Sequence, residues 1–336
     1  MSYLTHSVVL INVCRRIHVV SLDWFRALRD VIVGSLRDSW LPFPVDKSIC
    51  TKWREGLSFD SDSGTILYTS CLYQLAPVIE RAVAELERFG VTKGGALARL
   101  TAIGARFLGR ALLRPSDEDV DRANRIIRNI YGMLRALGVR FGVLDNEPYS
   151  GALLYELGFV NEFADYARSV YKVLRDNNVS EIITIDPHTQ YTLEKLYPRY
   201  VPEFNIKVRS YLDYLDSNKV KVRLSEFTIH DSCLYARYLN KYDLIRGLLR
   251  GKADIKEDPV ITGRDTSHCC GGPIESTYPE IAGRVASNRV RELVRLSRNI
   301  VTQCPICYVN LRRGIKLSVV EANLFDIAEV IEVGGS

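Results

Sequence analysis

Apolar positions follow two different periods along the chain, and each period predicts a different element. Residues 64–70 form a short apolar run of the strand type. Further strands are predicted at 139–144 and 181–185, with a helix at 159–174 between them. After the first strand, apolar positions recur three or four residues apart, as on one helix face, at Leu72, Leu75, Ile79, Val83 and Leu86. Strands that alternate with helices predict an α/β unit with a small parallel sheet.

The second half of the chain repeats this order of elements. Strands are predicted at 227–230 and 299–303, and helices at 234–249 and 279–296. We therefore predict an α/β fold of two tandem duplicated units, the first over residues 63–218 and the second over residues 219–336. The sequence itself also recurs at matching places: residues 67–73 match 229–235, Tyr149-Ser150-Gly151 matches Cys269-Cys270-Gly271, and Asp186-Pro187-His188-Thr189 matches Cys304-Pro305-Ile306-Cys307.

Two segments lie outside the repeat and are expected to be helical. Residues 1–62 form an N-terminal extension with short helices. An insertion at about 92–137 lengthens the first unit and holds two helical patterns. We expect the later pattern to form an amphipathic helix with a solvated basic face, which carries Arg122, Arg125, Arg128 and Arg135.

Composition and charge narrow the class of protein. The chain has 336 residues, of which 47% are hydrophobic and 25% charged, the balance of a folded globular protein. The net charge of +5 (45 − 40) includes no long run of like charges, so no nucleic-acid partner is expected. Polar residues interrupt the first apolar run, at residues 8–11, so we expect no membrane span and a cytoplasmic location. The low counts of Met and Gln are weakly typical of thermophile proteins.

The eight cysteines are unevenly distributed. Five of them lie between residues 233 and 307, at positions 233, 269, 270, 304 and 307. In a reducing cytoplasm, clustered cysteines indicate metal ligands or redox catalysis more than disulfides, although disulfides remain an alternative. Structural zinc and a cubane iron–sulfur cluster each take four ligands, so five thiolates favour a larger or more open cluster. Gly271 and Gly272 permit the irregular turn that the adjacent pair Cys269-Cys270 requires.

This spacing, one cysteine, then a CCG and then a CxxC, resembles the family of cysteine-rich CCG domain proteins over roughly residues 64–333. That family includes the B subunit of heterodisulfide reductase and the iron–sulfur subunits of glycolate, lactate and glycerol-3-phosphate dehydrogenases. The resemblance implies that one noncubane 4Fe-4S cluster is ligated by Cys233, Cys269, Cys270, Cys304 and Cys307. It also implies a redox subunit whose partners are a flavoprotein or a ferredoxin-type iron–sulfur protein, through which the chain could associate peripherally with a membrane.

The first half departs from the family pattern. Tyr149, Ser150, Asp186 and Thr189 stand where the family has cysteines, so no cluster is expected there. Cys71 remains and, with Asp186 and His188, could form a metal site of mixed donors. The alternative is a vestigial or substrate-facing pocket. The family's ferredoxin-like cysteine runs are absent from the sequence, so electrons are expected to pass through another subunit.

Other residues near these motifs carry weaker predictions. His230 and His268 flank cluster cysteines and could tune a cluster or supply a proton, or simply satisfy buried loops. Cys14 and Cys50 are expected to be small buried residues.

Three functions are compatible with the cysteine pattern. The first is an iron–sulfur redox subunit in a heterodisulfide-reductase-like or 2-hydroxyacid-dehydrogenase-like complex, in which an exposed iron could also cleave a disulfide. The second is a structural zinc-binding or interaction subunit without redox activity. The third is a thioredoxin-like dithiol at Cys304 and Cys307, which leaves the other three cysteines unexplained.

Overall fold

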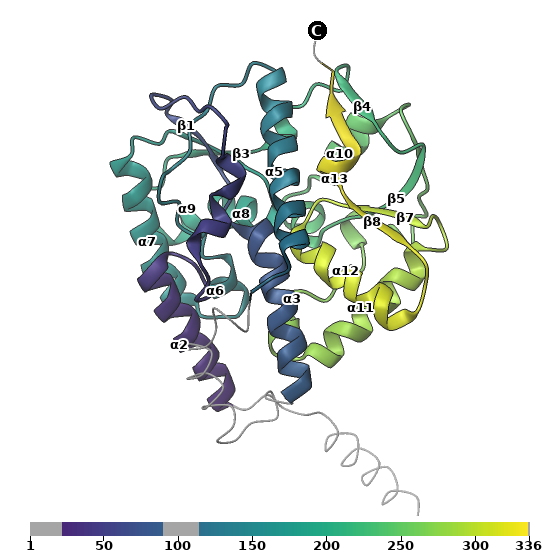
Figure 1. Ribbon diagram of the computed structural model, residues 1–336, viewed down its shortest axis with the longest axis horizontal. Helices are drawn as coiled ribbons and strands as arrows, with labels where there is room; N and C mark the ends of the chain where they lie inside the picture. The colour runs from purple at the N-terminus through teal and green to yellow at the C-terminus, as the bar shows by residue number, and fades with distance from the viewer. Residues whose placement is uncertain (1–21, 90–113, 335–336) are drawn as a thin grey trace, which may run out of the picture.

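The computed structural model describes residues 22–89 and 114–334 and shows two α/β halves side by side, with helices α3 and α5 running between them (Figure 1). The fold class predicted from the sequence is confirmed. The α-helices among the described residues are α2 (Leu22–Ser39), α3 (Leu72–Phe89), α5 (Asp117–Ala136), α6 (Ala152–Glu156), α7 (Val160–Asp176), α8 (Pro187–Tyr191), α9 (Tyr197–Tyr200), α10 (Tyr242–Leu249), α11 (Pro279–Leu293), α12 (Pro305–Ser318) and α13 (Ile327–Val330).

Each half contains a parallel sheet with the same arrangement of strands. The first sheet has the order β1-β2-β3, and the second has the order β6-β5-β7-β8, so β5-β7-β8 corresponds to β1-β2-β3. A further two-stranded antiparallel sheet pairs β4 with β9. The strands are β1 (Thr65–Tyr68), β2 (Glu181–Thr184), β3 (Lys207–Ser210), β4 (Val220–Val222), β5 (Glu226–His230), β6 (Asp254–Ile255), β7 (Asn299–Thr302), β8 (Asn323–Asp326) and β9 (Ile331–Val333).

Two predicted elements differ in the structure. The strand expected at 139–144 is reduced to a single bridge between Ile66 and Gly142, and on the other side of this segment the backbone N–H of Phe141 donates to the side chain of Asp60. The helix expected at 234–249 is broken into a short turn of π-helix at Leu234–Tyr238 and the separate helix α10. The break lies at Asn240, whose φ of 53° is left-handed and cannot continue a right-handed helix.

Helix α5 corrects the expectation of a solvated basic face. Its apolar face is buried as predicted, but three of its four arginines bind other parts of the molecule, and one of them, Arg128, donates to the carbonyl of Glu55. Arg122 forms an ion pair with Glu329, and Arg135 forms one with Asp60 at 2.5 Å. These side chains fasten the insertion to the N-terminal extension and to the second half. The earlier helical pattern of the insertion and residues 1–21 lie outside the described residues.

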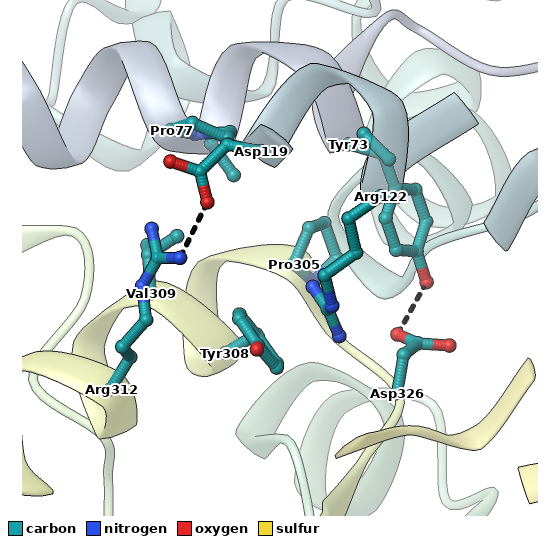
Figure 2. Close-up of a pocket in the computed structure, with 11 residues that line it drawn as sticks. Tyr73, Pro77, Asp119, Arg122, Pro305, Tyr308, Val309, Arg312 and Asp326 are labelled. Atoms are coloured by element: carbon teal, nitrogen blue, oxygen red, sulfur yellow. Dashed lines mark hydrogen bonds and ion pairs between the residues drawn. The ribbon is translucent and has the colours of Figure 1, made fainter. Parts of the chain in front are cut away.

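The two halves meet where α3 and α5 face α12 (Figure 2). Arg312 of α12 binds Asp119 of α5 at 2.5 Å, and the guanidinium of Arg122 lies 3.5 Å from the ring centre of Tyr308. At the other end of this contact, the hydroxyl of Tyr73 donates a hydrogen bond to Asp326 at 2.8 Å. An ion pair, a cation–π contact and a hydrogen bond between the halves thus fix the position of one sheet relative to the other.

We expect Asp326→Asn to flatten the dependence of stability on pH. Burial raises the pKa of Asp326 from 3.8 to about 7, so the folded chain keeps a proton that the unfolded chain releases near pH 4. The folded state therefore binds more protons, and the free energy of unfolding falls as the pH rises from about 4 to about 7. Asparagine cannot ionise, which removes this contribution. Urea unfolding at several pH values measures it, with the exposed Asp62→Asn as control. A slope in Asp326→Asn equal to that of the wild type would contradict the expectation.

Candidate functional site: a five-cysteine centre

The five predicted cysteines lie at the carboxyl end of the second sheet, where sites in parallel sheets usually form. Cys233 follows β5, and Cys304 follows β7. Cys307 lies in the first turn of α12, whose N-cap is Cys304. The adjacent pair Cys269 and Cys270 lies in the loop before α11.

Contacts between side chains join all five sulfurs into one set. Hydrogen bonds link Cys233 to Cys269, Cys269 to Cys270, Cys270 to Cys307 and Cys307 to Cys304. Cys270, Cys304 and Cys307 are at most 3% exposed, whereas Cys233 and Cys269 are partly exposed. The structure therefore gathers in one place sulfurs that are up to 74 positions apart in the chain (307 − 233).

Two of the sulfurs are held in surroundings that favour the thiolate. Hydrogen bonds from Cys233 and Cys270 lower the pKa of Cys269, and the backbone N–H of Gly271 donates to the same sulfur at 3.3 Å. Burial opposes ionisation of Cys304, but its hydrogen bond with Cys307 and the charge of His188 outweigh burial and lower its pKa. Thiolate is the form of cysteine that binds metals.

The loop that presents Cys269 and Cys270 depends on Gly271. Its φ is +102°, and a Cβ added there would lie 2.8 Å from the carbonyl oxygen of Ala282 in α11. The close approach of this loop to α11 explains why glycine follows the cysteine pair.

Gly271→Ala is expected to destabilise the fold more than a comparable substitution elsewhere. Gly138 also has a positive φ, of +74°, but an added Cβ would meet nothing within 4 Å. Both variants incur the left-handed strain of about 1–2 kcal/mol, and overpacking against Ala282 adds about 1–3 kcal/mol in Gly271→Ala alone. Urea unfolding of the two variants measures the difference. Equal losses of stability would show that the loop tolerates a Cβ.

His230 lies beside the sulfurs in a fixed orientation. One of its ring nitrogens is within 4.8 Å of the sulfurs of Cys270 and Cys307. The Nε of Arg289 donates to His230 Nδ1 at 3.1 Å, and burial together with the charge of Arg289 lowers the pKa of His230 to about 3. Because a guanidinium only donates hydrogen bonds, Nδ1 is the acceptor and the single ring proton lies on Nε2. Nε2 is buried without a partner among the described residues, so it is a hydrogen-bond donor available to the centre.

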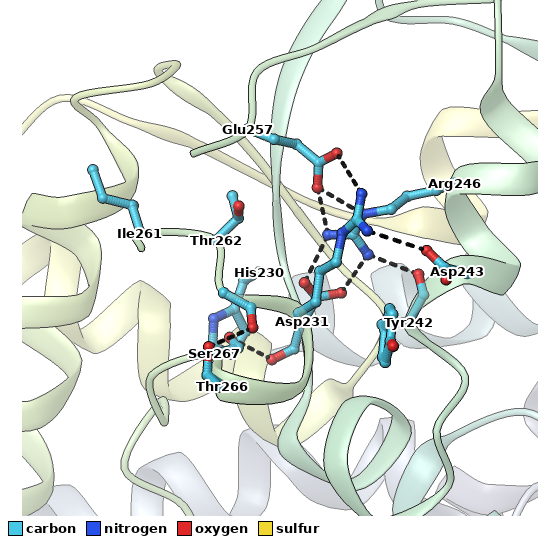
Figure 3. Close-up of polar contacts among 12 residues, drawn as sticks. His230, Asp231, Tyr242, Asp243, Arg246, Glu257, Ile261, Thr262, Thr266 and Ser267 are labelled. Atoms are coloured by element: carbon cyan, nitrogen blue, oxygen red, sulfur yellow. Dashed lines mark hydrogen bonds and ion pairs between the residues drawn. The ribbon is translucent and has the colours of Figure 1, made fainter. Parts of the chain in front are cut away.

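A buried ion pair and a hydrogen bond meet at Asp231, between the loops that carry Cys233 and Cys269 (Figure 3). Arg246 of α10 binds both oxygens of Asp231, at 2.9 and 2.8 Å, and also binds Glu257. The carbonyl of Asp231 accepts a hydrogen bond from the hydroxyl of Ser267 at 3.1 Å. Asp231 precedes Cys233 by two residues, and Ser267 precedes Cys269 by two residues. This network sets the spacing between the two cysteine loops.

His268 does not take the place predicted for it beside the sulfurs. Its side chain is 57% exposed and lies 2.9 Å from the carboxylate of Glu292. Of the two histidines that flank the cysteines in sequence, His230 is the one directed toward them.

The first half retains the frame of the site but not its sulfurs. Asp186 caps α8 through a hydrogen bond from the backbone N–H of Thr189 at 2.9 Å, just as Cys304 caps α12 by accepting from Cys307. Burial raises the pKa of Asp186 to about 6.

The predicted mixed metal site at Cys71, Asp186 and His188 is not formed. Cys71 is bonded to Cys50 in a disulfide, so its sulfur is not a free thiolate. Cys50 is buried as expected, but the bond to Cys71 was not predicted for it. Cys14, for which the same prediction was made, lies outside the described residues.

His188 instead faces the second half of the molecule. Its Nδ1 lies 2.6 Å from Oε1 of Glu156, and its ring is in hydrogen-bonding contact with Cys304. Although burial alone would lower it, the charges of Glu156 and Cys304 raise the pKa of His188. Sequence analysis missed this contact. The only available signal was that His188 occupies the repeat position of Ile306, between two cluster cysteines.

An apolar pocket lies beside these groups. Its walls include His188 from the first half and Ile306 and Pro273 from the second. Glu275 is 4% exposed there, and its Oε2 has no hydrogen-bond partner among the described residues. Burial raises the pKa of Glu275 to about 7. The corresponding segments of the two halves thus face one another across the pocket.

Comparison with known proteins agrees with this geometry. Residues 227–312 match the family model of the cysteine-rich (CCG) domain. None of the helices in the described residues has the length and apolar character needed to cross a bilayer.

Among curated proteins, the chain is 26% identical over 222 residues to the probable iron-sulfur-binding oxidoreductase FadF of Bacillus subtilis, covering 63% of this chain and 32% of that protein. It is 28% identical over 234 residues to the EtfAB:quinone oxidoreductase of Syntrophomonas wolfei, and this match also covers 63% of this chain and 32% of that protein. It is 25% identical over 214 residues to one subunit of the dihydromethanophenazine:CoB–CoM heterodisulfide reductase of Methanosarcina mazei, covering 59% of this chain and 52% of that relative. The chain thus spans about a third of the length of the first two relatives. Residues 227–312 of the chain therefore match the cysteine-rich CCG domain, in a protein similar to iron–sulfur oxidoreductases and reductase subunits.

Proposed function

We propose that this chain is an electron-transfer subunit of an iron–sulfur oxidoreductase and binds one 4Fe-4S cluster of the noncubane type. The observation that carries the proposal is the single connected set of five cysteine sulfurs in the second half. The ligands are Cys233, Cys269, Cys270, Cys304 and Cys307. The names of the relatives, which include an iron–sulfur-binding oxidoreductase and a heterodisulfide reductase subunit, support the same function.

The chemistry of the donor set fits a cluster better than structural zinc. Zinc in a structural site takes four ligands, whereas five sulfurs converge here. His230 cannot complete a zinc site through Nε2, because Arg289 holds the ring in the tautomer that carries a proton there. An iron–sulfur cluster, when bound, supplies one-electron redox chemistry, and the partly exposed Cys233 and Cys269 mark the side open to solvent.

The proposed partners are argued from the single cluster. A chain that carries one cluster needs a donor and an acceptor, so we propose that it works in a complex with a flavoprotein or a ferredoxin-type iron–sulfur protein. The complex would be heterodisulfide-reductase-like or 2-hydroxyacid-dehydrogenase-like. Association with a membrane through such a partner agrees with the name of one relative, a probable membrane-anchored ferredoxin of Chromohalobacter salexigens.

Anaerobic reductive titration tests whether the chain is a redox protein. We expect the purified chain to absorb visible light, and we expect the absorption to bleach reversibly as about one electron per chain is taken up. A colourless chain that contains zinc and takes up no electron would overturn the proposal in favour of a structural zinc subunit.

We also expect His230 to set the reduction potential. His230→Leu removes the Nε2–H donor, and hydrogen bonds to cluster sulfurs stabilise the extra negative charge of the reduced state. The potential should therefore fall in His230→Leu, whereas His230→Gln, which keeps an N–H near the same place, should restore part of it. His268→Leu, at an exposed position, is the control. Redox titration followed by EPR measures all three variants, and an unchanged potential in His230→Leu would rule out the hydrogen bond.

A further inference from the structure

A histidine that contacts Cys304 belongs to the other half of the molecule. His188 lies in α8, which follows the first sheet, and its ring contacts the Cys304 side chain at the N-terminus of α12. His188 is 8% exposed, and Cys304 is fully buried. Both residues lie at the carboxyl ends of the corresponding strands β2 and β7. The contact therefore joins corresponding segments of the two repeated units.

The hydrogen bond between His188 and Glu156 orients the ring as in a metal-binding histidine. Oε1 of Glu156 lies 2.6 Å from Nδ1. Histidines that ligate metals commonly donate one ring N–H to a carboxylate, which fixes the tautomer and leaves the other nitrogen for the metal. Nδ1–H donates to Glu156 in this arrangement, so Nε2 is the nitrogen left for the centre.

His188 and His230 are held in opposite ways. Arg289 donates to Nδ1 of His230, which places the proton on Nε2 and makes that nitrogen a donor. Glu156 accepts from Nδ1 of His188, which leaves the lone pair on Nε2 when the ring is neutral. One buried histidine is thus prepared to donate a hydrogen bond, and the other to donate an electron pair.

Nothing in the first half gives His188 a metal of its own to bind, as far as the described residues extend. The sulfur of Cys71 is in the disulfide with Cys50, and Asp186 caps α8. His188 also shares a pocket wall with Ile306, its counterpart in the repeat, so the two residues approach each other across the boundary between the halves.

We propose that Nε2 of His188 is a sixth protein ligand of the cluster, supplied by the first half to the centre of the second. The proposal rests on the proposed function, since it requires iron at the five cysteines. Ligation would require the neutral ring. It would also explain why the first half keeps the frame of a site whose own cysteines have been replaced.

Nitrogen hyperfine spectroscopy of the intact chain tests the proposal. The chain is prepared with natural and with ¹⁵N-labelled histidine, loaded with its cluster, and studied by ENDOR in the paramagnetic state. We expect a strongly coupled histidine nitrogen in the wild type that changes with the isotope. The signal should be lost in His188→Gln and kept in His268→Gln, the matched control at an exposed histidine.

The outcomes separate this proposal from the one on which it rests. Iron and sulfide bound without a strongly coupled nitrogen would overturn the ligand role of His188 and leave the redox function standing. The same holds for a strong coupling that survives in His188→Gln. Absence of a strongly coupled histidine nitrogen in the labelled wild type refutes the ligand role without any variant, so the proposal stays falsifiable even if His188→Gln does not fold. A chain without iron would refute the proposed function and the ligand together.

Discussion

Cys270→Ser is expected to remove most of the bound iron and the visible colour of the chain. Cys270 is 3% exposed and forms hydrogen bonds with both Cys269 and Cys307, so it lies in the middle of the connected sulfurs. A serine hydroxyl is a poor substitute for a thiolate ligand. Iron and acid-labile sulfide, measured after anaerobic purification, should fall from about four of each per chain to near zero.

Two further variants make this expectation specific. In Cys304→Ser, the serine hydroxyl should still cap α12 as the sulfur does, so the fold should survive while iron is lost. The double variant Cys50→Ser, Cys71→Ser removes the disulfide of the first half and should keep its iron. A thioredoxin-like dithiol uses only Cys304 and Cys307, so retention of full redox activity in Cys270→Ser would favour that alternative and contradict the cluster.

Arg246→Met is expected to lower the free energy of unfolding by about 3–5 kcal/mol. Arg246 binds both oxygens of Asp231, and the two side chains are 9% and 1% exposed. Removing the guanidinium leaves a buried carboxylate without its counter-charge, which costs far more than the loss of a surface contact. The loops of Cys233 and Cys269 should loosen as well, because Asp231 and Ser267 connect them.

The matched control is a similar pair at the surface. Arg223 binds Glu332 at 2.9 Å, but the two side chains are 55% and 45% exposed. Arg223→Met should therefore cost no more than about 1 kcal/mol. Urea unfolding of both variants under the same anaerobic conditions measures the difference. A similar small loss in both would show that the Asp231–Arg246 pair does not hold the site together.

Sequence patterns predicted the fold well where the signal was local or repeated. Strands at 65–68, 181–184, 226–230 and 299–302 lie where the apolar runs placed them, and the two sheets share the order expected of a duplication. The five cysteines were predicted as ligands from their spacing together with the resemblance to the CCG family. Motifs at strand ends are predictable because topology brings those ends together whatever the rest of the chain does.

Contacts between distant segments were harder to predict. The expected strand at 139–144 forms only one bridge, and Asp60, some 80 positions away, binds the N–H of Phe141 on the side of this segment that faces away from the sheet. The arginines of α5 were predicted to be solvated, but Glu329 and Asp60, which are distant in the sequence, form ion pairs with two of them. Helical periodicity continues through Asn240, and only the structure shows the left-handed residue that ends the helix there.

The two most informative residues of the first half were misassigned for the same reason. Cys71 and His188 were grouped with Asp186 because the repeat aligns Cys71 with Cys233 and Asp186 with Cys304, and His188 lies two residues after Asp186. Their partners are Cys50 and Cys304, which approach only after the chain has folded. An alignment of the halves identifies equivalent positions but not the direction in which a replaced side chain points.

The central claim is that one half of this chain binds a cluster and the other does not. The most direct test is to count iron, acid-labile sulfide and zinc in the full chain after anaerobic purification. The account predicts about four irons and four sulfides per chain, with little zinc. Stoichiometric zinc with almost no iron, or about eight irons distributed over both halves, would contradict it.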